Sequence, residues 1–296
     1  MPVKVSVWLL RSGWITLPLT AGPAASDAIS TFADAPRVAA AVGLFIAWGA
    51  GAVAVLAPHP MGLTLLRAVA PCFALLAIGA RVADQTTGAE SWGAIAATVI
   101  VMLLVSSAGV ARAAANGIAY GDEDRFPLRA PPALFIGPIP VARLLAIGGL
   151  ATGPLLLADE QVLGGVIALV LGVPVAVFAG RALHALSLRW LVVVPAGVVI
   201  VDPMTLSDPV LFVRRQVRAL RPLSSGTSAP HDAVDLRLGA VAGTVLLDLG
   251  EDVEILQRSR GRRSSANVAV HRLLIAVVHR DQMLHSAARR VPVEAR

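Results

Sequence analysis

The sequence predicts a bundle of about six transmembrane helices, followed by a small mainly-β domain that ends in a helix. Three observations carry this fold class. Of the 296 residues, 56% are hydrophobic and only 15% are charged, whereas soluble domains carry roughly 25% charge. Long apolar runs fill the chain up to about residue 186, and short β-branched runs separated by turns follow. We therefore expect a transmembrane helical domain over residues 1–186 and a water-exposed domain over residues 187–296.

Five apolar runs have about the length of a membrane-spanning helix, which needs roughly 20 residues to cross a hydrocarbon core of about 30 Å. These runs are residues 38–57, 63–82, 92–111, 141–158 and 162–183. The breaks between them carry charged residues or proline, as water-exposed turns do. Each run is therefore predicted to be one transmembrane helix.

Residues 5–25 are apolar except for Arg11, and Pro18 and Pro23 would shorten a helix there. The segment is a cleaved signal peptide, an interfacial helix, or a sixth span whose Arg11 reaches the inner headgroups. Six spans place most loop arginines on one side and most loop carboxylates on the other, in agreement with the positive-inside rule. We therefore predict a multi-pass protein of the inner cell membrane, with both termini in the cytoplasm.

Small residues recur at every fourth position of the last predicted span. They are Gly164, Ala168, Gly172, Ala176 and Gly180. Small residues at this spacing let another helix backbone come close, and dispersion then holds the two helices together in lipid. We expect a helix-packing seam here; the alternative is chance in an alanine-rich chain.

From residue 189 the pattern changes to that of strands, expected over residues 189–194, 198–201, 210–213, 234–238, 244–249 and 253–256. Gly250, Glu251 and Asp252 are predicted to form the turn between the last two strands. Asn267 is suited to cap a helix, and apolar residues from Val270 to Leu284 follow it at helical spacing. The tail is thus predicted to contain six or seven antiparallel strands, closed by an amphipathic helix.

This order resembles the pleckstrin-homology-like (PH-like) fold, in which a bent sheet is capped by a C-terminal helix. The residues that carry the resemblance are 189–202, 208–212 and the helix from Asn267. The chain is similar to actinobacterial multi-pass membrane proteins that carry a C-terminal PH-like domain. Lipid-binding PH-like domains usually have basic residues in the loop between their first two strands, whereas residues 194–197 carry no charge here. The resemblance implies a docking module that does not recognise inositol lipids in that way.

Few polar residues form a pattern that could carry chemistry. The loop at residues 116–140 contains three consecutive acidic residues, Asp122, Glu123 and Asp124. Such a cluster could bind a divalent cation, but no second carboxylate cluster completes a site, so pairing with Arg125 and Arg129 is favoured. The histidines lack zinc-motif spacing, and Cys72 is the single cysteine. We predict no catalytic residue, no metal site and no cofactor.

Arg67, about one turn into the run at residues 63–82, is the ionisable residue in a predicted span that best suits a functional role. Transport through the bundle would use such a residue. The favoured alternative is that Arg67 reaches the nearby headgroups.

Two groups of arginines stand out in the tail. The first contains Arg214, Arg215, Arg218 and Arg221, and the second contains Arg258, Arg260, Arg262 and Arg263. Near an anionic membrane surface each arginine contributes about 1 kcal/mol of binding free energy. A solvated basic rim is the equally weighted alternative.

The formal net charge of +6 does not indicate nucleic-acid binding, because cytoplasmic loops retain arginine and only 4% of residues are aromatic. The leading hypothesis is a non-enzymatic scaffold or docking protein. Its PH-like domain would contact membrane lipids and another protein, or a second copy of the chain. A small transporter or channel subunit, and a membrane enzyme of envelope-lipid metabolism, are the alternatives.

Overall fold

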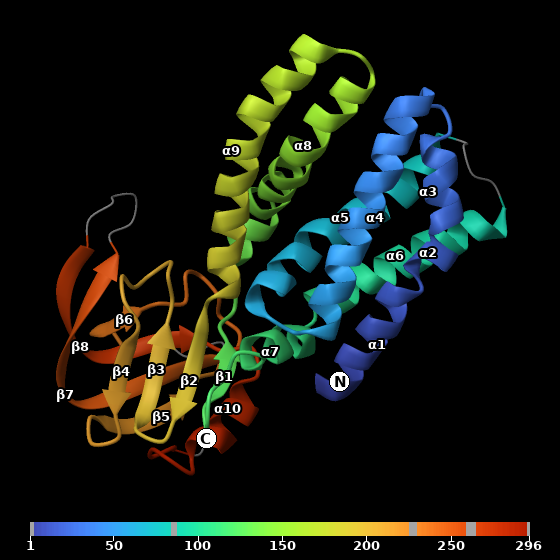
Figure 1. Cartoon of the computed structure of the whole chain (residues 1–296). Coiled ribbons are helices and arrows are strands. Elements are labelled where there is room, and N and C mark those ends of the chain that lie inside the picture. The colour runs from blue at the N-terminus through green and yellow to red at the C-terminus, as the bar shows by residue number, and fades with distance from the viewer. Residues whose placement is uncertain (1–2, 84–87, 225–229, 259–264, 295–296) are drawn as a thin grey trace. The chain divides into compact units, whose positions relative to one another are not determined.

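The computed structural model describes residues 3–83, 88–224, 230–258 and 265–294. The chain divides into two units (Figure 1). The helical unit consists of Met1–Ala114 and Pro138–His184, and the β unit consists of Ala115–Gly137 and Ala185–Arg296. Residues 115–137 therefore belong to the β unit, although the sequence predicted them as part of a loop within the transmembrane domain.

The helices of the membrane half follow one another along the chain. They are α1 (Val3–Ile15), α2 (Leu17–Thr20), α3 (Gly22–Ile29), α4 (Asp34–Leu56), α5 (Pro60–Val82), α6 (Ala89–Ser106), α7 (Ala108–Asn116), α8 (Pro138–Ala158) and α9 (Val162–Ser187). Of these, α4, α5, α6, α8 and α9 are long and apolar enough to cross a membrane. A multi-pass membrane protein is therefore confirmed at the level of five candidate spans.

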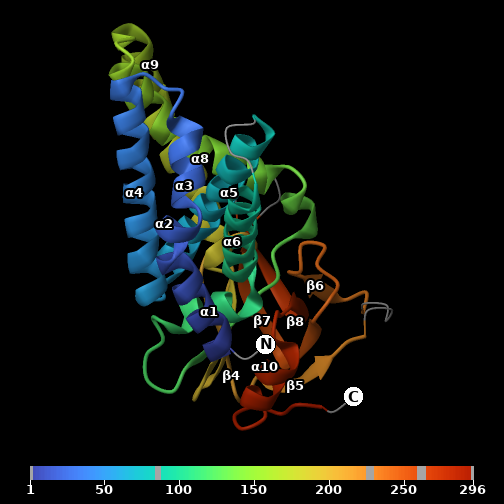
Figure 2. The same ribbon diagram turned by 90° about the vertical axis from the view of Figure 1, so that its right-hand side faces the viewer.

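The N-terminal segment does not form one long helix as a sixth span would require. It is divided into α1, α2 and α3, which run beside α4 (Figure 2). Pro18 and Pro23 lie in the first turns of α2 and α3, because proline lacks the amide hydrogen that would continue the preceding helix. None of these three short helices is among the candidate spans.

Reciprocal hydrogen bonds join α1 to α4. The indole of Trp14 donates to the carbonyl of Trp48 at 2.9 Å, and the indole of Trp48 donates to the carbonyl of Trp14 at 3.0 Å. Gly51 makes room for them, since a Cβ there would lie 1.9 Å from the Trp14 ring. Arg11 donates to the carbonyls of Val55 and Leu56, so it caps the end of α4. These contacts favour a segment that stays in the bundle over a cleaved signal peptide.

The five small residues predicted to form a seam on α9 differ in their surroundings. Gly172 meets Gly149 of α8, where an added Cβ would lie 2.4 Å from a carbonyl oxygen, and Ala176 is buried. A Cβ added at Gly180 would meet no described atom within 4 Å beyond the neighbouring turns of its own helix, and one at Gly164 would make only ordinary contacts. A spacing of four residues turns by about 40° per step on a helix of 3.6 residues per turn, so residues sixteen apart face different neighbours.

The β unit consists of two four-stranded sheets and a final helix (Figure 1). The first sheet has the order β1-β2-β3-β4, formed by β1 (Asp124–Pro127), β2 (Trp190–Val194), β3 (Gly197–Val201) and β4 (Val210–Val213). The second has the order β5-β7-β8-β6, formed by β5 (Val217–Pro222), β6 (Ala233–Asp235), β7 (Thr244–Arg258) and β8 (Ser265–Ala276). All neighbours are antiparallel except β6 and β8, which are parallel.

The predicted helix from Asn267 is wrong over most of its length. Residues Ser265–Ala276 form β8, and the helix α10 covers only Arg280–Ala287. Pairing with β7 supplies the backbone hydrogen bonds of β8 along its length. Near its end both faces of β8 are buried, including Leu273, Leu274 and Ile275. This hides the two-residue period of a strand and imitates helical spacing.

The turn predicted at Gly250-Glu251-Asp252 is also absent, because β7 continues through it. The register with β8 shifts between Asp248 and Val253, so the extra residues form an irregularity in one long strand. The exposure of residues 250–252 explains why they resemble a turn in the sequence. Such irregularities bend a strand and increase its twist.

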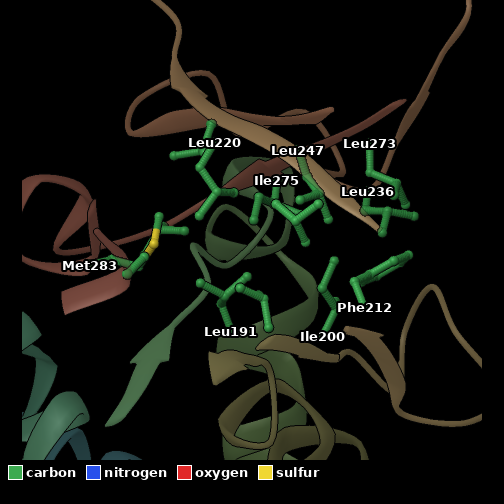
Figure 3. Close-up of a cluster of buried hydrophobic side chains, with 14 of the residues drawn as sticks. Leu191, Ile200, Phe212, Leu220, Leu236, Leu247, Leu273, Ile275 and Met283 are labelled. Carbon is green, nitrogen blue, oxygen red and sulfur yellow. The ribbon is translucent and has the colours of Figure 1, made fainter. Parts of the chain in front are cut away.

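The core of the β unit lies between the two sheets and α10. Figure 3 shows Leu191, Ile200 and Phe212 of the first sheet facing Leu220, Leu247 and Leu273 of the second, with Met283 of α10 at one side. Phe126 of β1 and Leu128 just after it belong to the same cluster. The segment between α7 and α8 therefore supplies part of this core.

Candidate functional site

Three exposed arginines gather where β4 passes into β5. Arg214 and Arg215 lie in the turn between these strands, and Arg218 lies on β5. All three are exposed and make no ion pair or side-chain hydrogen bond with the described part of the chain. We call Arg214, Arg215 and Arg218 the basic turn.

Most of the other arginines that the structure describes in the β unit have defined partners. Ion pairs or side-chain hydrogen bonds engage Arg125, Arg189, Arg221, Arg237, Arg272, Arg280 and Arg290. Arg221, which the sequence grouped with the basic turn, contacts Asp248 at 3.4 Å and Glu294 at 2.9 Å. The structure thus separates one structural arginine from three that have no described ion-pair partner.

Of the second predicted arginine group, the structure describes Arg258, whereas Arg260, Arg262 and Arg263 lie outside the described residues. The Arg214 amide donates to Ala196, in the turn where β2 ends. The Arg258 amide donates to Thr205, beyond the end of β3 that pairs with Trp190 at the start of β2. Arg258 is exposed, and it therefore lies at the other end of the first sheet from the basic turn.

A buried ion pair joins the residues that flank β2 and β3. Arg189 and Asp202 are each 2% exposed, and two of their N–O distances are 2.8 Å. Arg189 also donates to the carbonyl of Arg129, and Asp202 accepts from the amide of Met204. The pair is therefore satisfied on both sides and joins the segment after β1 to β2 and β3, which indicates a structural role.

The acidic residues of the middle loop are used locally. Glu123 accepts from Arg125 at 2.9 Å and from the amide of Tyr120, and Arg125 lies over the ring of Trp190. Burial raises the pKa of Glu123, but these hydrogen bonds outweigh it and hold that pKa below its ordinary value. Within the described ranges, no three His, Cys, Asp or Glu residues are grouped so that they could hold a metal ion.

A second basic cluster lies in the helical unit, where α5, α8 and α9 meet. The hydroxyl of Thr64 on α5 lies 3.0 Å from Nδ1 of His184 on α9. Arg67, one turn further along α5, is close enough to Arg143 on α8 for the two charges to interact. The sequence singled out Arg67 alone. Arg143 and His184 lie far from it in the chain, so only the helix packing brings them together.

An apolar cavity of about 390 Å³ opens elsewhere in the helical unit. Its walls come from α2, α3, α4, α5 and α6, and include Phe45, Trp48 and Phe73. Its few polar lining side chains are Ser26 and Thr98. This lining suits a hydrocarbon group but provides no charged group for catalysis or ion binding.

Comparisons of the chain with protein-family models, with curated proteins and with solved structures gave no match.

Proposed function

We propose that this membrane protein is a non-enzymatic docking protein, whose basic turn binds an acidic segment of a cytosolic partner protein. The observation that carries the proposal is the contrast among its arginines. Arg214, Arg215 and Arg218 are exposed and have no described ion-pair partner, whereas most other described arginines of the β unit are engaged. Three adjacent guanidinium groups present planar donors that match carboxylate geometry.

The basic turn lies beside the end of β2 that is remote from Trp190. We propose a protein partner for it, because the carboxylates of an acidic segment match the planar donors of guanidinium groups. We also propose a PH-like fold for the β unit, supported by its two packed sheets and terminal helix.

The cytoplasmic placement of the β unit belongs to this proposal. All described acidic residues of the helical unit lie at one end of its helices: Asp27, Asp34, Glu90, Asp159 and Glu160. Arg11, Arg67 and Arg143 lie toward the other end. The positive-inside rule puts this second end in the cytoplasm. Reporter fusions at Gly88 and Glu160 should then read outside, and fusions at Tyr120 and the C-terminus should read inside.

The docking proposal is tested by affinity purification of the full chain from native membranes, with quantitative mass spectrometry of co-purifying proteins. Replacing Arg214, Arg215 and Arg218 by Gln should remove an acidic partner that the unmodified chain retains. Raising the salt should release the same partner, because the Debye length contracts from about 10 Å at 0.1 M to about 3 Å at 1 M.

Arg258→Gln is the matched control, since it removes an exposed arginine at the other end of the sheet. It should leave the partner bound. Equal recovery of the same proteins with the triple variant would refute docking at the basic turn. Loss of the partner only with Arg258→Gln would assign docking to the other end of the sheet.

A further inference from the structure

Arg67 and Arg143 are two positively charged residues on α5 and α8, two contacting helices of the membrane-spanning part of the chain. Arg67 lies seven residues into α5 and Arg143 five residues into α8, or about 10 Å and 8 Å along the helices at 1.5 Å per residue. Both side chains are partly buried, and their charges interact. Both helices also begin at this end, and their N-termini add positive potential.

No described carboxylate compensates these charges. Neither guanidinium makes an ion pair or hydrogen bond with the described residues, and Nε of Arg143 is buried without a partner. The five described acidic residues of the helical unit lie at the opposite ends of their helices. Thr64 and His184 supply a hydroxyl and an imidazole, and Cys72 supplies a thiol near Arg143, but none of them is a carboxylate.

Two like charges without a described counter-charge, near enough to interact in an apolar bundle, are unfavourable, because both desolvation and mutual repulsion oppose them. A single anion between them would reverse both effects. Guanidinium groups bind the oxygens of phosphate in pairs, with charge-assisted hydrogen bonds. We propose that Arg67 and Arg143, with Thr64 and His184 beside them, form a binding site for the headgroup phosphate of an anionic phospholipid.

The depth of the site favours a lipid over a soluble phosphate. About two turns from the ends of α5 and α8, the arginine stems lie among apolar side chains, and their heads are within reach of the interface. A phospholipid places its phosphate at this level and its acyl chains along the helices. Arg67 alone could reach any headgroup, whereas the pair defines a fixed position for one phosphate.

The site is tested with the full chain purified in a neutral detergent. Native mass spectrometry should detect retained anionic phospholipid, and Arg67→Gln or Arg143→Gln should lower its occupancy about tenfold, as expected for loss of a charge-assisted hydrogen bond. Added phosphatidylglycerol should raise the unfolding temperature of the unmodified chain. It should not raise that of the double variant.

Arg181→Gln is the matched control, because Arg181 is an exposed arginine near the same end of α9. It should retain the lipid and the thermal shift. With phosphatidylcholine alone, the double variant should unfold at or above the temperature of the unmodified chain, because uncompensated charges have been removed. Such an unfolding transition also shows that the double variant folds. Equal lipid loss with Arg181→Gln would reduce the effect to general charge attraction. An equal thermal shift with inorganic phosphate would overturn the assignment to a lipid.

Discussion

The helical unit and the β unit place the same kinds of side chain in opposite environments. Phe45 and Phe178 in the helical unit are 65% and 78% exposed, whereas Phe126 and Phe212 in the β unit are fully buried. The apolar surface of the helices faces outward because lipid solvates it as well as another protein surface would. In the β unit, water drives the same groups into a core between two sheets.

Different interactions therefore hold the two units together. In the helical unit, the specific contacts are backbone approaches and directional bonds, such as Gly149 against Gly172 and the reciprocal indole bonds of Trp14 and Trp48. In the β unit they are buried area and one internal ion pair. Mutations should follow this division. Loss of volume or charge should damage the β unit, and added volume should damage the helical unit.

The largest expected effect comes from removing β1 and its flanking residues. A fragment of residues 185–296 lacks Phe126 and Leu128, and loss of these two core side chains costs roughly 5–10 kcal/mol. A whole domain is stable by roughly 5–15 kcal/mol. We therefore expect no cooperative thermal transition by circular dichroism. Fusing residues 115–137 to the fragment through a flexible linker should restore it. A sharp transition in the shorter fragment would contradict the role of β1.

Asp202→Asn should be the most damaging single substitution of a polar residue in the β unit. It leaves Arg189 buried without its counter-charge, at a cost of roughly 3–5 kcal/mol. The paired control is Asp235→Asn, which breaks a more exposed ion pair with Arg237 and should cost about 1 kcal/mol or less. Thermal unfolding of the full chain, monitored by protease cleavage of the β unit, measures the loss of stability in both variants. Equal losses would mean that burial does not distinguish the two pairs.

Gly172→Leu should destabilise the helical unit by roughly 1–3 kcal/mol, because the new side chain would collide with the backbone of Gly149. Gly180→Leu tests the same change where an added Cβ would meet no described atom within 4 Å beyond the neighbouring turns of its own helix, and its effect should be close to zero. Unfolding temperatures in one detergent compare the two variants. Similar unfolding temperatures of the two variants would contradict a stabilising role of the α8–α9 contact.

The smallest effect concerns pH. The pKa of Glu123 is lowered in the folded chain, so its stabilising contribution is present above its unfolded pKa of about 4.3 and is lost as the pH falls through the folded value. Glu123→Gln should cost about 1 kcal/mol or less at pH 7, and the variant and the unmodified chain should converge in acid. A constant difference between pH 3 and pH 7 would show that the carboxylate charge is irrelevant.

Much of the architecture could be predicted from the sequence, because the sequence patterns that indicate it are local. The apolar runs of α4, α5, α6, α8 and α9 exceed what any soluble helix requires, and the strands β2, β3 and β4 were predicted close to their observed bounds. The strand β1 was missed, since the partner that gives Asp124–Pro127 its hydrogen bonds lies more than sixty residues away. The helix predicted over β8 failed for the same reason, because pairing with β7 outweighed local spacing.

For the candidate sites, the sequence by itself determined the number and kind of charges: many arginines, few carboxylates, and a membrane half with almost no internal acid. Only the tertiary structure decided which charges are neutralised. Arg221 pairs with Asp248 and Glu294, and Arg189 pairs with Asp202. The three arginines of the basic turn have no described partner. The meeting of Arg67 with Arg143 was likewise invisible in the sequence. An ion pair requires two groups within about 4 Å in space, and separation along the chain does not determine that distance.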